Sequence, residues 1–502
     1  MKTVFTQDWK DWITSNVDAG QDKDGIFKIL LDEGYAFAAI AKQMDYQPSR
    51  PVEELVNPFH ANAAQQQRDS ASSSAAVKQK FSGNNGLAIA KGNIFTPNAA
   101  SFKSDSIDLR LVDDFLSAEE CIRLIELIKA KLRPSSVANF QVDNNVRTSR
   151  TCDLGQMNDP FVKEIDIRIC KLLGIHEAYT EVLQGQYYEV GQEFKAHTDF
   201  FDPHEFEQHC SQYGQRTYTV MIYLNDVEQG GETTFRHINI GFKPMTGQAV
   251  IWNSLNPDGT PNMNTLHQAK PVEKGFKAVI TKWFRTTCPQ AQSIPMMTRE
   301  INEYVPNYTR RGIAITKLPD KYFKKVNDFY HDNHKEIREE HVEGGFIVSG
   351  NKGSSKSSSK QRQSSSLIEL TPALRQEVHD VLKPIMEQWS GVDLEPTFVY
   401  GIREYHNGAL LKMHRDRIDT HIISAIINVD QETDVEWPLV IEDNYYRIHH
   451  IFLKPGDMVF YEGGRLLHGR PLAFEGKSFA NIFCHFKPSN YVAPKFVDDQ
   501  QL

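Results

Sequence analysis

The sequence predicts an α+β protein of mainly β structure, in which two sheet sandwiches or barrels follow one another, each supported by helices. In two blocks, at about 105–290 and 305–490, helical patterns come first and several short strand patterns follow. Helices followed by many short strands favour a sandwich or barrel with helices on one side. The length of 502 residues suits two to four domains. Hydrophobic residues make up 40% and charged residues 24%, as in ordinary globular proteins.

Two segments outside these blocks are organised differently. Residues 1–60 read as short helices, because apolar residues recur at helical spacing from Ile26 to Ile40. They form either a helical hairpin with its own core or a module that recognises a partner. Residues 61–100 begin with a polar, small and aperiodic run, which is typical of a linker. A serine-rich stretch at 349–366 is expected to form a flexible insertion in the second block.

The first block is placed at 101–290 and opens with a helix at 115–132. Ser117 is its expected N-cap and Glu120 completes a capping box. Strand patterns follow, at 179–190, 216–227, 247–252 and 277–284.

The second block is placed at 305–495 and repeats this order. Its helical patterns cover 321–337 and 370–389, and its strand patterns cover 398–405, 421–429, 457–463 and 478–486. KPMTGQAVIW in the first block matches KPGDMVFY in the second, and HQAKPVEKGFK matches HGRPLAFEGK. Ordered matches of this kind favour an internal repeat, in which 217 residues separate His197 from His414.

Each block carries one group of polar residues in the same order. The first group consists of Tyr188, His197, Asp199, His267 and Lys277, and the second of Tyr405, His414, Asp416, His468 and Lys477. In both groups the tyrosine precedes the first histidine by nine residues, and the lysine follows the distal histidine by nine or ten. A single His-x-Asp triplet could be a surface loop pair, but two ordered groups with near-equal spacing are hard to explain by chance.

The residue types in these groups suit a ferrous ion. Residues i and i+2 of a strand face the same way, so His-x-Asp presents an imidazole and a carboxylate to one side. A distant histidine completes a set of two His and one carboxylate, which leaves open positions on Fe(II). Structural zinc would prefer a closed tetrahedron. The sequence therefore predicts two mononuclear iron sites in an oxygenase.

Lys277 adds an independent argument. If the strand at 277–284 turns this face inward, an ammonium is buried, which is costly unless it meets an anion. A dicarboxylate cosubstrate such as 2-oxoglutarate supplies one, because its keto-acid end can chelate iron while its far carboxylate reaches Lys277. Tyr188 and Thr233 could add hydroxyl donors to that carboxylate.

Residues 105–290 resemble the catalytic domain of prolyl 4-hydroxylases. The matching text is QYY at 186–188, GQEFKAHTDFFD at 191–202, YLN at 223–225, GGETTF at 230–235 and NPDG at 256–259. The resemblance implies a double-stranded β-helix (jelly roll). It assigns Fe(II) to His197, Asp199 and His267, and 2-oxoglutarate to Lys277, Tyr188 and Thr233. It also implies Tyr223 as an extra cosubstrate contact, and it places Arg216 and Arg147 near a peptide substrate.

The activity that the resemblance implies is that of a dioxygenase dependent on Fe(II) and 2-oxoglutarate (procollagen-proline 4-dioxygenase-like). Such an enzyme uses O2 to hydroxylate an unactivated C–H bond, here that of a prolyl residue in a peptide or protein, and ascorbate is a candidate reductant. One alternative is a hydroxylase of a free amino acid or another small molecule. Another is a metal-bound interaction scaffold with a non-catalytic second domain.

The second block resembles the same superfamily less closely, because it lacks the GGET segment. The retained His414, Asp416 and His468 predict a second iron site. Tyr405 and Lys477 are the predicted cosubstrate contacts, with Arg470, two residues after the distal histidine, as an alternative anion partner. The second block could instead be a decayed copy kept for packing or docking, or an enzyme with a different substrate.

Charge and composition exclude several classes of partner. The net charge of −9 disfavours nucleic acid and anionic lipid as partners. No apolar run approaches the ~20 residues of a membrane span. The first residues lack the apolar core of a secretory signal, and the six cysteines form no Cys-x-x-Cys pair. A cytoplasmic protein is therefore expected, and the sequence makes no prediction of its oligomeric state.

Overall fold

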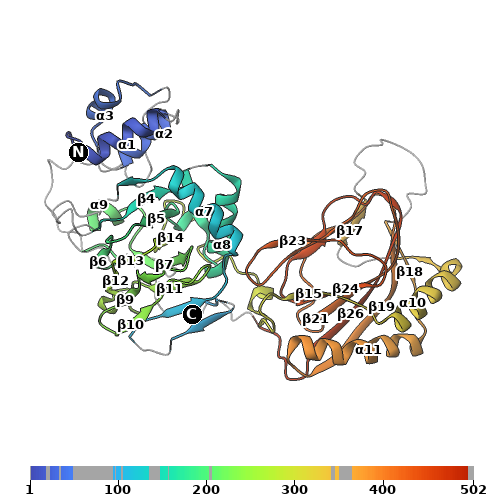
Figure 1. Cartoon of the computed structure of the whole chain (residues 1–502). Coiled ribbons are helices and arrows are strands. Elements are labelled where there is room, and N and C mark those ends of the chain that lie inside the picture. The colour runs from blue at the N-terminus through green and yellow to red at the C-terminus, as the bar shows by residue number, and fades with distance from the viewer. Residues whose placement is uncertain are drawn as a thin grey trace. The chain divides into compact units, whose positions relative to one another are not determined.

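The computed structural model divides into two compact units, Met1–Thr298 and Arg299–Leu502 (Figure 1). Residues 61–93 of the predicted linker and residues 350–363 of the predicted insertion lie outside the residues that the structure describes. The structure describes residues 2–18, 23–32, 35–48, 94–96, 98–102, 106–134, 147–156, 158–202, 206–340, 345–349 and 364–495.

Three short helices occupy the first part of the chain, as the helical spacing predicted. They are α1 (Gln7–Asp18), α2 (Lys23–Asp32) and α3 (Phe37–Met44). Their buried apolar residues form a hydrophobic cluster of their own, consisting of Phe5, Trp9, Trp12, Ile13, Ile26, Phe27, Leu30, Tyr35, Ile40 and Met44. A cluster this rich in aromatic rings buries enough apolar surface to hold three short helices together.

The larger sheet of the first unit has eight strands, and every pairing in it is antiparallel. Its first strand lies partly within the expected linker, because pairing with the second strand draws it into the sheet. In spatial order the strands are β1 (Ala99–Ser101), β2 (Leu109–Val112), β11 (Ala249–Asn253), β7 (Arg216–Tyr223), β14 (Lys277–Arg285), β5 (Gln184–Tyr188), β4 (Arg150–Asp153) and β3 (Arg133–Pro134).

A four-stranded antiparallel sheet completes the first unit, together with one further strand pair. In spatial order its strands are β10 (Ile240–Phe242), β9 (Thr233–Phe235), β12 (His267–Ala269) and β6 (Phe194–His197). The pair consists of β13 (Val272–Lys274) and β8 (Gln229–Gly230). Side chains from both larger sheets share one apolar cluster, which includes Tyr188, Tyr223, Phe235, Trp252, Ala269 and Val279. The two sheets therefore enclose a common interior.

Helices α7 (Ala118–Ala130), α8 (Pro160–Leu173) and α9 (Phe206–Cys210) support the first unit. The expected capping box is present in α7, where the Ser117 side chain accepts from the Glu120 backbone and the Glu120 side chain accepts from the Ser117 backbone. This helix packs on β5, and a Cβ added at Gly185 would lie 2.5 Å from Ile128 Cγ1. The glycine thus lets the helix approach the strand closely.

The second unit also consists of two antiparallel sheets. The seven-stranded sheet has the order β15 (Ile313–Lys317), β24 (Asp457–Tyr461), β21 (Ile423–Thr433), β26 (Gly476–Pro488), β19 (Leu394–Tyr405), β18 (Ser365–Ile368) and β16 (Arg338–Glu339). The five-stranded sheet has the order β17 (Ile347–Ser349), β20 (Ala409–His414), β25 (His468–Arg470), β22 (Leu439–Glu442) and β23 (Ile448–Ile451). The chain is therefore mainly β with several antiparallel sheets, as the sequence predicted.

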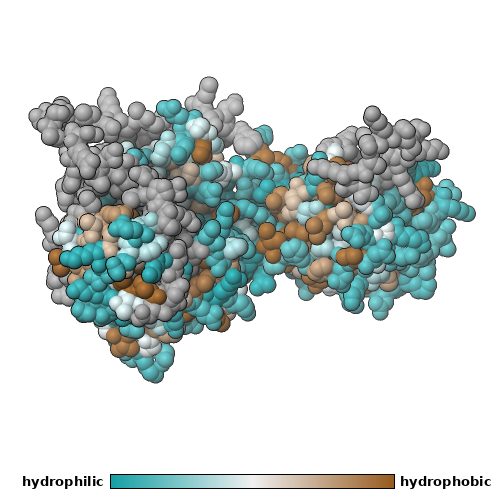
Figure 2. All heavy atoms as spheres, turned by 90° about the horizontal axis from the view of Figure 1, so that it is seen from above, coloured by the Kyte–Doolittle hydropathy of each residue, from teal (hydrophilic) through white to brown (hydrophobic). Residues whose placement is uncertain are grey.

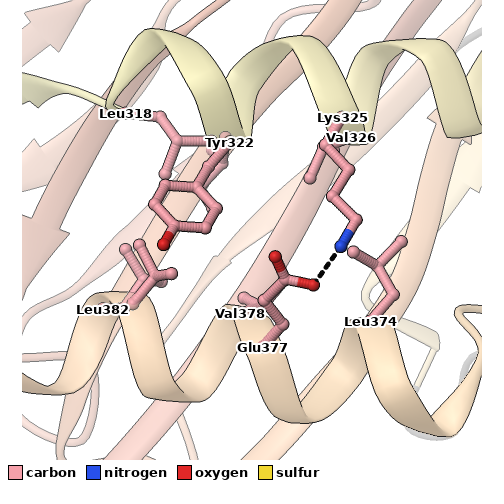
Figure 3. A pocket seen from close by; sticks show the side chains of 10 residues that line it. Leu318, Tyr322, Lys325, Val326, Leu374, Glu377, Val378 and Leu382 are labelled. Carbon is pink, nitrogen blue, oxygen red and sulfur yellow. Dashed lines mark hydrogen bonds and ion pairs between the residues drawn. The ribbon is translucent and has the colours of Figure 1, made fainter.

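Two helices cover one face of the larger sheet of this unit (Figure 1). They are α10 (Asp320–Asn333) and α11 (Pro372–Ser390). Figure 3 shows the small pocket between them, which is mostly apolar and is bridged by an ion pair between Lys325 and Glu377. Tyr322 and Leu382 face each other across this pocket (Figure 3). The pocket belongs to helix packing and contains none of the predicted site residues.

The surface seen in Figure 2 is mainly hydrophilic, with apolar residues scattered among polar ones. In the part of the chain that the structure describes, no helix is both long and apolar enough to cross a membrane. All six cysteines lie among the described residues; they are buried, and none of them forms a disulfide bond there.

Candidate metal and cosubstrate sites

His197, Asp199 and His267 lie together in the first unit. One ligand atom from each side chain lies within 4.8 Å of the other two. His197 ends β6 and His267 begins β12, and the two residues are directly paired across these antiparallel strands. Asp199 follows His197 by two residues, which brings its carboxylate to the same side. The predicted convergence of three distant residues is present in the structure.

Backbone carbonyls orient both imidazoles. His197 Nδ1 donates to the Lys195 carbonyl at 2.8 Å, and His267 Nδ1 donates to the Thr265 carbonyl at 2.8 Å. These bonds leave each Nε2 unprotonated and available, which is the arrangement that a metal ligand needs. Burial lowers the pKa of His197 to about 3, and the neighbouring His267 adds to this effect. His197 is therefore suited to bind a cation in its neutral form, and the Nδ1 bond of His267 turns its Nε2 toward the same place.

The carboxylate of Asp199 is fixed by a hydroxyl group. Thr219 Oγ1 donates to Asp199 Oδ2 at 2.7 Å, and Arg216 Nη1 donates to the Asp199 backbone carbonyl at 3.3 Å. Burial alone would raise the pKa of Asp199, but the triad imidazoles, Arg216 and Thr219 together lower it. Two neutral imidazoles and one carboxylate on one side fit a ferrous ion with open positions.

Lys277 is buried inside the first unit, with 1% of its surface exposed. Its Nζ donates to the Gly231 carbonyl at 2.8 Å and to Thr233 Oγ1 at 3.2 Å. Burial lowers the pKa of Lys277 to about 7, and Glu232 offsets only part of this effect. Among the described residues no carboxylate forms an ion pair with it. A buried ammonium without a counter-ion is costly, so the structure offers a place for an anion here.

Two tyrosine rings flank this ammonium. The Lys277 Nζ lies 5.4 Å from the ring centroid of Tyr188 and 5.4 Å from that of Tyr223. The Tyr188 hydroxyl donates to Gln186 Oε1 at 2.8 Å, whereas the Tyr223 hydroxyl is buried beside Thr233 and its own O–H has no acceptor among the described residues. Tyr223 therefore keeps a donor for a ligand, and Tyr188 would have to exchange its bond to Gln186.

The two predicted substrate arginines lie close to the triad. Arg216 holds Glu181 through Nε and Nη2, each at 2.6 Å, while its Nη1 reaches the Asp199 backbone. The Arg147 guanidinium lies 4.9 Å from the ring centroid of Phe194, which stacks on His197 at 3.5 Å. Arg216 thus contacts the backbone of Asp199, and Arg147 lies one ring away from His197.

The second unit contains a matching cluster of His414, Asp416 and His468, with ligand atoms within 4.8 Å of one another. The Nε2 atoms of His414 and His468 lie 3.8 Å and 3.7 Å from Asp416 Oδ1. The two histidines are paired across β20 and β25. Their Nδ1 atoms bond to the carbonyls of Lys412 and Leu466, each at 2.9 Å. Burial lowers the pKa of His468 to about 4.

Comparison with known proteins agrees with this chemistry. Residues 183–285 match the family model described as the 2OG-Fe(II) oxygenase superfamily. Probable prolyl 4-hydroxylase 10 of Arabidopsis thaliana is 35% identical over 195 residues, which cover 34% of this chain and 66% of that protein. Probable prolyl 4-hydroxylase 6 of the same plant is 32% identical over 197 residues, covering 34% and 67%. The chain belongs to the prolyl 4-hydroxylase family of 2OG-Fe(II) oxygenases.

Membership in the prolyl 4-hydroxylase family confirms Fe(II) and 2-oxoglutarate as the cofactors that the sequence predicted. The chain spans 66% of the length of the first of these relatives, and the family model ends before the second unit begins. A solved structure of a viral collagen prolyl hydroxylase from Paramecium Bursaria Chlorella virus-1, in complex with 2OG, is 26% identical. Its match covers 35% of this chain and 95% of that chain, with a TM-score of 0.29.

The expectation that Lys477 is the cosubstrate contact of the second unit is wrong. Its side chain is exposed and pairs with Glu432 at 2.7 Å. The residue paired with Tyr405 across the strands is Phe479, so Lys477 lies two residues, or about 7 Å, beyond that level. Arg470 is instead the buried cation here, and burial lowers its pKa to about 10. The geometry therefore favours Arg470, which the sequence offered as an alternative anion partner, over Lys477.

Three hydroxyl groups near the aspartates were missed from the sequence, those of Thr219, Ser424 and Tyr461, the last of which donates to Asp416 Oδ2 at 3.3 Å. Ser424 Oγ lies 3.5 Å from Asp416 Oδ2 and takes the place that Thr219 has beside Asp199. The signal was present for Thr219, which lies four residues before Tyr223 on one strand and so shares its face. A serine or threonine on an inward strand face is common, however, and by itself indicates no function.

Proposed function

We propose that this protein is an Fe(II)- and 2-oxoglutarate-dependent dioxygenase that hydroxylates a prolyl residue in a peptide or protein. The observation that carries the proposal is the buried Lys277, which lacks a counter-ion. Its hydrogen-bond partner Thr233 lies on β9, the strand next to His267 on β12, so the ammonium and the triad share one interior. The naming of the relatives as prolyl 4-hydroxylases supports the choice of a prolyl substrate.

In this proposal His197, Asp199 and His267 hold the ferrous ion through two Nε2 atoms and a carboxylate oxygen. Bound iron and 2-oxoglutarate activate O2 and supply the oxidising chemistry. The residues of the chain fix the geometry: two backbone carbonyls orient the imidazoles, and Thr219 orients the carboxylate. Because all three ligands approach from one side, positions remain open for cosubstrate and O2.

The cosubstrate is assigned to the interior behind the triad. Lys277 receives the far carboxylate, with Thr233 and Tyr223 as hydroxyl donors and Tyr188 as the flanking ring. Binding would replace an uncompensated charge with an ion pair in a site that excludes water, where charge-assisted hydrogen bonds are strongest. The apolar walls contributed by Val279 and Trp252 keep bulk water out of this interior.

The peptide is assigned to the opposite, open side of the triad. Arg216 and Arg147 lie there, and both guanidinium groups are held in place by protein partners, Glu181 for the first and Gln184 for the second. Guanidinium groups held in this way can orient a peptide backbone without rearrangement. A partner that is a peptide or protein, and not nucleic acid, also agrees with the net charge of −9.

We further propose that the chain holds two double-stranded β-helix (jelly-roll) domains, at 101–290 and 305–495, formed by an internal repeat. Residues 1–60 are then a separate helical segment and 61–100 a linker. The support is the equal strand order of the two units, in which β2, β11, β7, β14, β5 and β4 correspond to β15, β24, β21, β26, β19 and β18. In the second domain, His414, Asp416 and His468 form a second iron site.

A cytoplasmic location is part of the same proposal. Six buried cysteines outside any disulfide bond agree with a reducing compartment, which also keeps iron ferrous. Ascorbate is assigned the role of an external reductant and needs no site in the protein.

The experiment that tests the proposal measures succinate release from 2-oxoglutarate, with and without proline-containing peptides, for three forms of the full chain. The wild type should release succinate in proportion to hydroxylated peptide, and Lys277→Met should not. The control is Lys274→Met. It removes an exposed lysine that lies three residues before Lys277 and pairs with the exposed Glu228. Equal turnover by the Lys277 variant would refute the assignment, and peptide-independent turnover would point to a small-molecule substrate.

A further inference from the structure

The second unit contains a buried guanidinium that lacks an ion-pair partner. Arg470 follows His468 by two residues on β25, so both side chains face the interior. Its Nη1 donates to the Trp437 carbonyl, but its buried Nη2 has no hydrogen bond, and no described carboxylate pairs with it. The guanidinium lies beside two adjacent rings, 4.7 Å from the centroid of Trp437 and 4.5 Å from that of Phe479.

A second unpartnered polar atom lies in the same interior. The Tyr405 hydroxyl is fully buried and, although the Arg403 guanidinium interacts with its oxygen, its own O–H has no acceptor among the described residues; its ring packs on Trp437 at 5.1 Å. Tyr405 interacts electrostatically with Arg470 and also with Arg403, two residues earlier on β19. The Arg403 charge is already neutralised by Glu340, at 2.6 Å and 2.7 Å. One guanidinium N–H group and one hydroxyl group in this interior therefore lack a hydrogen-bond acceptor.

Strand register shows that this interior corresponds to the one that holds Lys277. Lys277 pairs with Tyr188 in the first unit, and Phe479 pairs with Tyr405 in the second. The residue two positions after the distal histidine is Ala269 in the first unit and Arg470 in the second. The cation thus stands on the larger sheet in the first unit (β14) and on the smaller sheet in the second (β25), and an apolar residue, Phe479 or Ala269, occupies the other position.

The carbonyl that anchors each cation also corresponds. Thr233 pairs with Ala269, and because Val440 pairs with Gly469, the next pair of that ladder is Leu439 with Arg470. Counting back two residues from Thr233 and from Leu439 leads to Gly231 and Trp437. The Gly231 carbonyl accepts from Lys277 Nζ, and the Trp437 carbonyl accepts from Arg470 Nη1. Both units therefore hold a buried cation at the same depth, by the same backbone position.

From these contacts we propose that the second unit binds a small 2-oxo dicarboxylate of the 2-oxoglutarate type, whose far carboxylate is received by Arg470 Nη2 and the Tyr405 hydroxyl. This inference rests on the proposed metal site at His414, Asp416 and His468. Two donors suit the two oxygens of one carboxylate, and the rings of Trp437 and Phe479 close the site around it. A phosphate would need more donors than this apolar surrounding offers, because Leu439 replaces the hydroxyl of Thr233.

The test is equilibrium dialysis of labelled 2-oxoglutarate against the full chain with Fe(II), in the absence of oxygen, so that binding is measured without turnover. The wild type is expected to bind two equivalents and Lys277→Met one. In the Lys277→Met background, Arg470→Met should remove the remaining equivalent, and Tyr405→Phe should weaken it about tenfold or more. Lys477→Met, the matched control on the exposed lysine of the same unit, should leave it unchanged.

Unfolding midpoints separate loss of binding from loss of fold. Arg470→Met replaces a buried, unpaired charge with an apolar side chain of similar length, so its ligand-free midpoint should equal or exceed that of the parent. Tyr405→Phe removes only an unbonded hydroxyl and should behave likewise. The inference is overturned if the wild type binds a single equivalent that Lys277→Met abolishes. It is also overturned if the second equivalent persists in Arg470→Met or is lost in Lys477→Met. Retention of both equivalents in Lys277→Met would instead contradict the assignment of the first site. The second site would then be tested by whether Arg470→Met removes one of the two equivalents.

Discussion

Lys277 and Tyr188 are paired across neighbouring antiparallel strands, with the ammonium 5.4 Å from the tyrosine ring centroid. In the second unit the tyrosine is kept as Tyr405, but Phe479 stands opposite it. The two units thus place a buried cation beside an equivalent tyrosine from two different strands. Because neither cation has an ion-pair partner among the described residues, their variants report directly on anion binding.

Replacing Lys277 with Met should abolish the stabilisation that 2-oxoglutarate gives to the first unit. The buried ion pair with the ligand is lost, and the expected fall in affinity is about tenfold to a hundredfold. The ligand-free protein should be at least as stable as the wild type, because an unpaired buried charge is removed. Thermal unfolding with and without the ligand measures both effects. A ligand-induced shift as large as that of Lys274→Met would contradict the assignment.

The affinity of the first site for 2-oxoglutarate should depend on pH near neutrality. The pKa of Lys277 is lowered by burial to about 7, so its ammonium form is present below that pH and lost above it. Affinity should therefore fall as the pH rises above about 7, by roughly tenfold per unit for one coupled proton, and binding at pH 8 should take up a proton. Calorimetry in buffers of different ionisation enthalpy detects the uptake. A binding heat that is independent of the buffer would refute it.

The same pKa shift predicts how the stability of the ligand-free first unit varies with pH. An unfolded Lys277 keeps its proton up to its ordinary pKa, whereas the folded one loses it near 7. The unfolded chain therefore binds more protons between these values, and the contribution of this residue to stability rises with pH in that window. Denaturant unfolding of the wild type and Lys277→Met across the window should show converging stabilities. A gap that widens with rising pH would have the wrong sign.

Thr219 is expected to set the affinity of the first triad for its metal. Thr219→Val removes the hydroxyl that holds Asp199 Oδ2 while keeping the shape of the side chain. Loss of such an outer partner costs about 10- to 100-fold in metal affinity, so Fe(II) should dissociate at correspondingly higher concentrations. Thr219→Ser keeps the hydroxyl and should restore most of the affinity. Metal content after anaerobic dialysis tests this, and equal retention by the valine and serine variants would exclude the role.

The packing of α7 on β5 gives a prediction about stability alone. Gly185→Ala would place a Cβ 2.5 Å from Ile128 Cγ1. The resulting overlap should cost about 1–3 kcal/mol of unfolding free energy. Gly185→Ala combined with Ile128→Val removes a methyl group from the contact and should recover part of the loss. Denaturant unfolding measures both variants, and an unchanged midpoint for the single variant would show that the helix can move away freely.

Local patterns predicted the elements and the triads well, because the signals lie in short stretches of chain. Ser117 and Glu120 predicted the start of α7 through their reciprocal backbone bonds. The His-x-Asp spacing placed two ligands on one side of a strand whatever the rest of the fold. The distal histidines could be located because His267 and His468 each begin a stretch of similar sequence, HQAKPVEKGFK and HGRPLAFEGK.

Arg470, the buried cation of the second unit, could not be predicted from the spacing of residues in short stretches of chain. Counting residues from His468 leads to Lys477, but the position opposite Tyr405 is set by the pairing of β19 with β26 and is occupied by Phe479. Pairing register depends on the whole sheet, and a shift of two residues moves a side chain about 7 Å along the strand. Arg470 faces inward because it follows His468 by two residues, a local signal that the search for a matching lysine outweighed.

The most direct test of the central claim is the mass of a proline-containing peptide after incubation with the full chain, Fe(II), 2-oxoglutarate and O2. The account predicts that the wild type adds the mass of one oxygen atom to a prolyl residue, only when Fe(II) and 2-oxoglutarate are both present. It also predicts that His197→Ala, with an unchanged unfolding midpoint, adds none. A peptide oxidised equally by His197→Ala would contradict the account.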